Sequence, residues 1–121
     1  MLRLYKFSEN MMSDSFKDRE KGFEWKYQLD QNQAFRAQSR RDRLFGKWVA
    51  VKLGLAGHEA DNYATAVVDS NFEKPGDEDM LDKVRADLKA KQIEISDIGL
   101  RTALYEAYGE AAKQISEETK K

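Results

Sequence analysis

The sequence predicts an all-α protein: a four-helix bundle with a mobile or projecting N-terminal helical segment. Three observations lead to this fold class. The chain has 121 residues, which is enough for one domain with its own core but not for two. It contains one proline and seven glycines, so few residues interrupt long helices. Several stretches repeat apolar residues every three or four positions, which is the spacing of an amphipathic helix.

The first helical stretch begins near Ser15 and differs from the others. Ser15 and Asp18 form the Ser-x-x-Asp pattern that caps the start of a helix. The aromatic residues that follow fall on several faces, which is typical of a segment that projects from a bundle or becomes ordered against a partner. We expect a disordered extension at residues 1–12, this N-terminal segment at residues 13–28, the bundle at residues 29–117 and a frayed tail at residues 118–121.

From Ala34 onward the apolar spacing becomes regular and predicts the first helix of the bundle. Gly46 is a weak point in this helix, where a kink could form. Gly54 and Gly57 flank two residues and predict that the helix stops there. Arg41 interrupts the stripe and Phe45 widens it. The side chains expected to be buried are those of Ala34, Ala37, Leu44, Trp48, Val51 and Leu55.

Three further helices follow, separated by turn signals. The first runs from about His58 to Asn71, and Pro75-Gly76 then predicts a turn. Asp77 is placed to cap the next helix, which ends near Gln92, and Ser96 is placed to cap the last one. The expected buried residues are Ala60, Tyr63, Ala64, Val67, Val68 and Phe72 in the first of these helices and Met80, Leu81, Val84 and Leu88 in the next. In the last helix, one face is expected to hold Ile98, Arg101, Leu104, Tyr105, Tyr108, Ala111, Ala112 and Ile115.

The composition argues against several classes of function. With no cysteine and one histidine, His58, one chain cannot form a disulfide, a thiolate metal site or a site with several histidine ligands. The net charge of −1 argues against a nucleic-acid binder. No apolar run approaches the roughly 20 residues of a membrane span. No Gly-rich phosphate loop or nucleophilic triad stands out. We therefore expect a cytoplasmic protein that is not an enzyme, holds no cofactor and does not insert into a membrane.

A basic cluster lies along the first bundle helix, and it has two interpretations. It is either a site for an anionic ligand, with Arg36, Arg40, Arg41 and Arg43 holding phosphate groups, or a solvated face that pairs with the acidic turn at residues 73–82. Arg41 differs from its neighbours because it lies in the apolar stripe. It is either a snorkelling side chain or the buried partner of a carboxylate.

The chain resembles a known family over nearly everything from Ser13 to about Ile115. The resemblance starts with the run Phe16-x-x-Arg19-Glu20-Lys21-x-Phe23-Glu24-x-Lys26-Tyr27 and continues through FRAQSRRDRLFGKWVAVKLGL and YATAVVDSNFEKPGDEDMLDKVRADL. These motifs resemble the ζ subunits of alphaproteobacteria, the inhibitor proteins of the F1Fo ATP synthase. RLFGKWVA and NFEKPGDED are the most distinctive of them.

The resemblance implies a function and a set of contact residues. It implies a four-helix bundle whose N-terminal inhibitory segment inserts at a catalytic α/β interface of F1 and blocks ATP hydrolysis. The implied partners are the α, β and γ subunits of F1, and the implied location is peripheral, on the F1 sector at the inner membrane. The mitochondrial ATPase inhibitor has similarly spaced Arg-Glu, Glu and Tyr residues. The residues assigned to the F1 contact are Phe16, Asp18, Arg19, Glu20, Lys21, Phe23, Glu24 and Tyr27.

Two hypotheses follow from the sequence. The first is a regulatory subunit that inhibits F1 through its N-terminal segment. The alternative is a small helical module that binds an adenine nucleotide or RNA through the Arg36–Lys52 basic cluster. Deletion of residues 13–27 would abolish the first activity, whereas charge reversal at Arg40, Arg41 and Arg43 would abolish the second.

Overall fold

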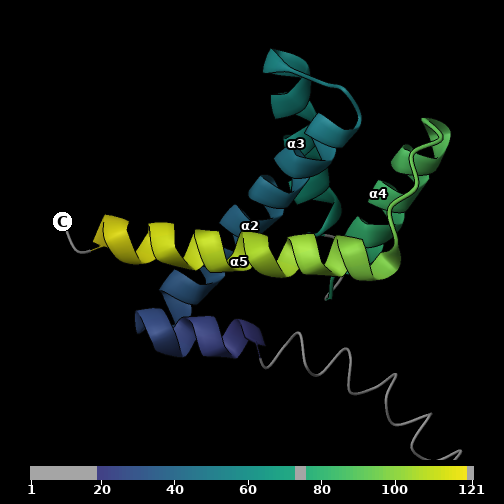
Figure 1. Ribbon diagram of the computed structural model, residues 1–121. Coiled ribbons are helices and arrows are strands. Elements are labelled where there is room, and N and C mark those ends of the chain that lie inside the picture. The colour runs from purple at the N-terminus through teal and green to yellow at the C-terminus, as the bar shows by residue number, and fades with distance from the viewer. Residues whose placement is uncertain (1–18, 73–75, 120–121) are drawn as a thin grey trace, which may run out of the picture.

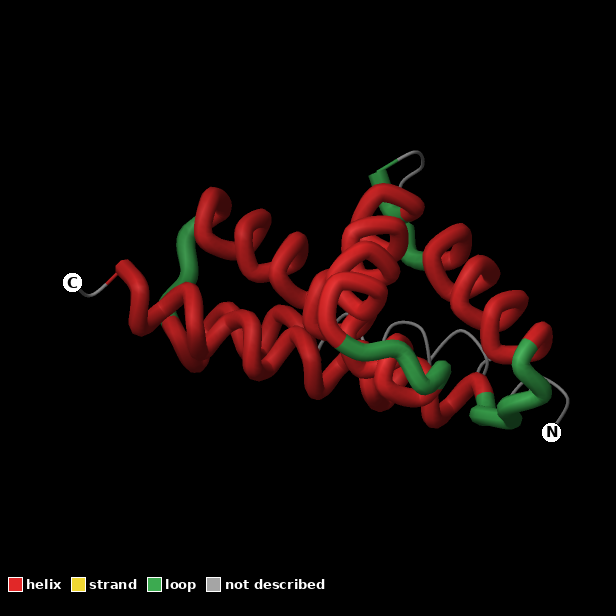
Figure 2. The backbone as a smooth tube through the Cα atoms, turned by 90° about the horizontal axis from the view of Figure 1, so that it is seen from above, coloured by secondary structure: helices red, strands yellow, loops and turns green. Residues whose placement is uncertain are grey.

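The computed structural model describes residues 19–72 and 76–119 and confirms the all-α fold (Figures 1 and 2). Residues 19–27 are helical and are called the N-terminal helix below. Within the described ranges the chain forms no strand. Among the described helices, none combines the length and the apolar character needed to cross a membrane. The helices that follow are α2 (Gln31–Lys52), α3 (Gly57–Ser70), α4 (Glu78–Ala90) and α5 (Asp97–Thr119).

The helix α2 is the centre of the arrangement. It packs against α5 and against α3, and α3 in turn contacts α4. Figure 1 shows α2 crossing the long helix α5, with the N-terminal helix lying alongside α5. The four helices α2 to α5 therefore form the bundle that the sequence predicts, and the N-terminal helix is added to its outside.

The break between the N-terminal helix and α2 has a clear local cause. The amide of Leu29 donates to the Glu24 carbonyl at 2.9 Å and that of Gln28 to the Trp25 carbonyl at 3.2 Å, while Gln28 adopts a φ of 55°. This is the Schellman pattern that ends a helix. Asp30 then caps α2 in a reciprocal capping box with Gln33, with hydrogen bonds of 2.7 and 2.9 Å. The predicted cap at Ser15 lies outside the described residues.

Two clusters of buried apolar side chains hold the bundle together. All four bundle helices contribute to the larger cluster, whose members are Phe45, Val49, Val67, Met80, Leu81, Val84, Leu88, Leu100 and Leu104. The smaller cluster lies between α2 and α5 and consists of Ala37, Tyr108, Ala111, Ala112 and Ile115. Phe23, Tyr27 and Leu29 pack against this smaller cluster, so the N-terminal helix covers one end of the core.

The buried face of α2 differs from the predicted apolar stripe. Val51 is 70 % exposed, whereas Arg41 and Asp42 are buried. The predicted buried face was placed wrongly because it was based on apolar residues alone. The helix α2 packs between α3 and α5 and buries charged residues as well. The same reliance on apolar residues misplaced two residues at helix ends: Phe72, after α3, is 65 % exposed, and Ile98, in the first turn of α5, is 58 % exposed.

Three local expectations also need revision. Gly46 lies within the uninterrupted helix α2 at a close approach to α3, where an added Cβ would lie 2.8 Å from the Ala64 Cα. Asp77 occupies the N-cap position of α4, but its side chain makes no cap hydrogen bond and binds Arg41 instead. α5 extends to Thr119, two residues into the expected frayed tail, and Thr119 accepts a 2.8 Å hydrogen bond from Gln33. At the other end of α5, the Ser96 cap is confirmed by a 3.0 Å bond from the Gly99 amide to its hydroxyl.

Candidate partner-binding site

The N-terminal helix is attached to α5 through an aromatic contact. The ring centroid of Phe23 lies 5.0 Å from that of Tyr105 and 6.1 Å from that of Tyr108. The ring also lies directly over Gly109, where an added Cβ would be 3.0 Å from the Phe23 Cζ. Gly109 is therefore the position at which α5 has room for this ring. Nearby, the Tyr108 hydroxyl donates a 2.9 Å hydrogen bond to the Glu24 carboxylate.

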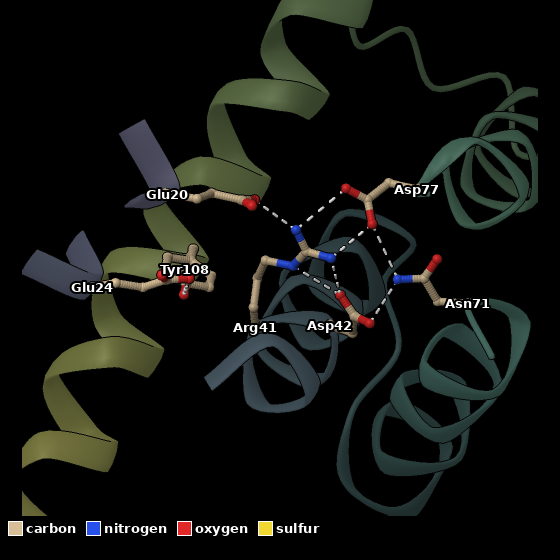
Figure 3. Close-up of polar contacts among 7 residues, drawn as sticks. All are labelled: Glu20, Glu24, Arg41, Asp42, Asn71, Asp77 and Tyr108. Carbon is tan, nitrogen blue, oxygen red and sulfur yellow. Dashed lines mark hydrogen bonds and ion pairs between the residues drawn. The ribbon is translucent and has the colours of Figure 1, made fainter. Parts of the chain in front are cut away.

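A second attachment is made by Arg41, whose side chain is fully buried (Figure 3). Its guanidinium donates to Glu20 at 2.7 Å, to Asp77 at 2.7 Å and to Asp42 at 2.9 Å. Asn71 completes the group by donating to Asp42 at 2.8 Å and to Asp77 at 3.2 Å. These five residues, called the Arg41 cluster, come from the N-terminal helix, from α2, and from the ends of α3 and α4 that flank the turn between them.

The Arg41 cluster contains more negative than positive charge, because three carboxylates surround one guanidinium. Burial has the largest effect on the Glu20 carboxyl and raises its pKa, although the charge of Arg41 acts in the opposite direction. Burial likewise raises the pKa of Asp42. For Arg41, burial alone would lower the pKa, but the charges of Asp42, Asp77 and Glu20 together raise it, so the guanidinium stays protonated.

Tyr108 is also affected by its position in this contact. Burial raises the pKa of its hydroxyl, and the hydrogen bond to Glu24 raises it further. The hydroxyl therefore keeps its proton and acts as a donor to the Glu24 carboxylate.

Most of the predicted contact residues that the structure describes face the bundle. Phe16 and Asp18 lie outside the described residues. Glu20, Phe23 and Glu24 make the contacts above, and the Tyr27 side chain packs against the smaller apolar cluster. Arg19 is exposed, and its guanidinium lies 5.3 Å from the Tyr105 ring centroid. Lys21 is exposed on another side of the helix.

The structure places further residues beside the predicted contact residues. Trp25 is 84 % exposed, the highest value among the exposed large apolar residues of the described chain. It borders an open hollow of about 710 Å³ that Lys21 and Leu29 also line. Gly109 and Asn71 carried no strong sequence signal. A glycine inside a helical pattern can mark a close contact, and that was the available hint for Gly109.

The arginines of the basic cluster separate in the structure. Arg36, Arg40 and Arg43 line a hollow of about 380 Å³ between α2, α3 and α5, whereas Arg41 is held by the cluster of carboxylates. The interpretation of Arg41 as the buried partner of a carboxylate is thus confirmed. Arg40 pairs with Glu118 at 3.0 Å and Arg43 donates to the Thr65 hydroxyl at 3.3 Å.

Fold and site together define a class: a small helical bundle whose candidate site is a helix held on the bundle surface by protein side chains. In the described part of the chain, no group of three or more His, Cys, Asp or Glu residues could hold a metal ion. Comparison with family models then identifies the family. The model described as ATPase inhibitor subunit zeta matches residues 12–114, so this chain belongs to that family. Comparison with curated proteins finds no match.

Membership in this family supports a general role for the chain as an inhibitor of the F1-ATPase, and it implies that the chain binds the ATPase.

Proposed function

We propose that residues 13–28 insert at a catalytic α/β interface of F1 and thereby inhibit ATP hydrolysis, while the bundle positions them. The protein would then work on the F1 sector at the inner membrane, in contact with the α, β and γ subunits. The observation that carries this proposal is the family match, which includes residues 13–28. The exposed Trp25 and Arg19 of the N-terminal helix are of the types that contribute most to protein interfaces.

The local structure supports the proposal, because the segment can act as a separate unit. The N-terminal helix ends in its own Schellman motif at Gln28, and α2 begins with its own capping box at Asp30. Movement of the N-terminal helix therefore does not require α2 to lose its cap. A short segment that leaves the bundle can enter a cleft that opens in one catalytic state, at the cost of conformational entropy on binding.

The test is a titration of F1 with three forms of this protein: the full chain, a chain that begins at Met12 and a chain that begins at Gln28. We expect the first two to inhibit ATP hydrolysis and the third to be inactive. Circular dichroism of the third form must show that the bundle remains folded. Inhibition by the form that begins at Gln28 would refute insertion of the N-terminal segment.

The hollow beside Arg36, Arg40 and Arg43 favours a second candidate function, the binding of an anionic ligand such as an adenine nucleotide. Arg41 does not contribute to it, because its guanidinium is buried and already surrounded by carboxylates. Titration of ATP against the full chain at two salt concentrations tests this candidate. Binding that is unaffected by Arg40→Glu together with Arg43→Glu would exclude it, since phosphate contacts to arginine should be lost in that variant.

A further inference from the structure

The bundle occupies the face of the N-terminal helix that the proposed function assigns to F1. Glu20 binds Arg41 at 2.7 Å, Glu24 accepts from Tyr108 at 2.9 Å, and the Phe23 ring lies over Gly109. These three side chains are partly buried against the bundle, so the atoms that make these contacts are not available to another protein while the helix is docked. Docking on the bundle and insertion into F1 are therefore alternative states of the same residues.

The bundle presents a surface that fits this helix. The surface, called the docking seat, consists of Arg41 from α2 and Tyr105, Tyr108 and Gly109 from α5. The absence of a side chain at Gly109 lets the Phe23 ring approach the α5 backbone, and the two tyrosine rings lie against it. The guanidinium of Arg41 and the hydroxyl of Tyr108 lie opposite the carboxyl groups of Glu20 and Glu24, so each carboxyl group has a hydrogen-bond donor.

The buried charge of Arg41 keeps its ion-pair partners in the bundle when the N-terminal helix leaves. Without Glu20, Arg41 keeps its ion pairs with Asp42 and Asp77, at 2.9 and 2.7 Å, so no buried positive charge is left unpaired. Departure of Glu20 also reduces the excess of negative charge in the Arg41 cluster. Docking can thus be reversed without unfolding α2 to α5.

We propose that the docking seat is an autoinhibitory contact, in which the bundle competes with F1 for the inward face of the N-terminal helix. This inference rests on the proposed function. The apparent affinity for F1 is then the intrinsic affinity of the free segment reduced by the fraction of molecules whose segment is undocked. A substitution that disrupts the seat, and that leaves residues 13–28 unchanged, makes the protein a stronger inhibitor.

Gly109→Leu in the full chain is the sharpest test. The new side chain would occupy the space of the Phe23 ring, which already lies 3.0 Å from the position of a Cβ. Leucine also favours the helix more than glycine, so α5 should remain intact. Thr102→Leu is the matched control, because it adds the same side chain to an exposed position of α5. Tyr108→Phe is a milder second variant, which removes the hydroxyl that binds Glu24 and keeps the ring.

Two measurements are made on each variant. Hydrogen exchange of the amides of residues 23–27 reports docking, and titration of ATP hydrolysis by F1 gives the concentration for half-inhibition. We expect Gly109→Leu to lose protection of the amides of residues 23–27. We also expect its concentration for half-inhibition to be about tenfold lower than that of the wild type, which is the change for a segment that is docked in about 90 % of wild-type molecules. Tyr108→Phe should change both quantities less, and Thr102→Leu should change neither.

The outcomes separate the two proposals. If Gly109→Leu leaves the protection unchanged, or if it undocks the helix without lowering the concentration for half-inhibition, autoinhibition is overturned while insertion stands. A higher concentration for half-inhibition would also overturn it, because the docked form would then be the one that binds F1. If the chain that begins at Gln28 still inhibits, the proposed function fails, and autoinhibition fails with it.

Discussion

Gly46→Ala tests whether α2 and α3 are held together by a close backbone contact. The added methyl group would lie 2.8 Å from the Ala64 Cα and 3.1 Å from the Val67 Cβ. Carbon atoms pack best at about 3.5–4.0 Å, so the two helices would have to separate by roughly 0.7 Å at their crossing. The atom that must move first belongs to the backbone of α3 and cannot rotate away.

Two opposing contributions set the size of the effect. Alanine favours a helix over glycine by about 1 kcal/mol. Overpacking a well-packed core costs about 1–3 kcal/mol, and a clash with backbone belongs at the upper end of that range. The free energy of unfolding should therefore fall by about 2 kcal/mol, which lowers Tm by roughly 8 °C if each kcal/mol shifts Tm by about 4 °C in a domain of this size.

The assay is unfolding in urea, monitored by circular dichroism. Gly22→Ala is the matched control, because a Cβ added at Gly22 has no neighbour within 4 Å. It should leave the unfolding midpoint of the bundle unchanged or raise it slightly. A midpoint for Gly46→Ala that equals or exceeds that of the wild type would show that helix propensity dominates and that the α2–α3 contact is not as close as described.

Three other perturbations have clear expected results. Arg41→Met removes the cation that pairs with the buried Asp42 and the partly buried Glu20 and Asp77, and it should lower the free energy of unfolding by about 3–5 kcal/mol in urea titrations. Arg40→Met, which breaks a partly exposed pair with Glu118, should cost no more than about 1 kcal/mol. Because burial raises the pKa of Glu20 above 4.5, the docked chain binds a proton more tightly than the undocked chain. Docking of the N-terminal helix should therefore weaken as the pH rises from 4.5 through the raised pKa of Glu20, and Glu20→Gln should remove this dependence on pH. Hydrogen exchange, corrected for the intrinsic exchange rates at each pH, measures the docking. Gln92→Gly should raise the free energy of unfolding by about 0.5–1 kcal/mol, since Gln92 has a φ of 58°, a conformation that costs residues other than glycine about 1–2 kcal/mol. An unchanged or lower value would contradict the expected strain there.

The helices could be predicted from the sequence because residues that cap or end helices mark most of the helix boundaries. Gly54 ends α2 with a φ of 81°, Ser96 caps α5, and the predicted core residues of α4 are all buried. The end of the N-terminal helix was harder to place. There the left-handed position of the Schellman motif is occupied by Gln28, a residue that sequence reasoning does not associate with a helix stop.

The site was less predictable than the fold, because it depends on contacts between distant residues. Glu20, Arg41 and Asp77 are brought together by tertiary packing, and nothing in their local patterns indicates three partners for one guanidinium. Asp77 looked like a helix cap because its position is right for one, but pairing with a buried charge took precedence. The seat at Gly109 could be recognised only once the Phe23 ring was placed against it.

The Arg41 cluster also has a consequence for the order in which the chain folds. Its members are spread from residue 20 to residue 77, so a chain that has emerged from the ribosome only as far as α3 lacks the Asp77 carboxylate. The guanidinium would have Asp42 and Glu20 as partners at that stage, and its third carboxylate would still be missing. We therefore expect the Arg41 cluster to be completed only after the start of α4 has been synthesised, which couples α2 and α3 to α4 in the folded bundle.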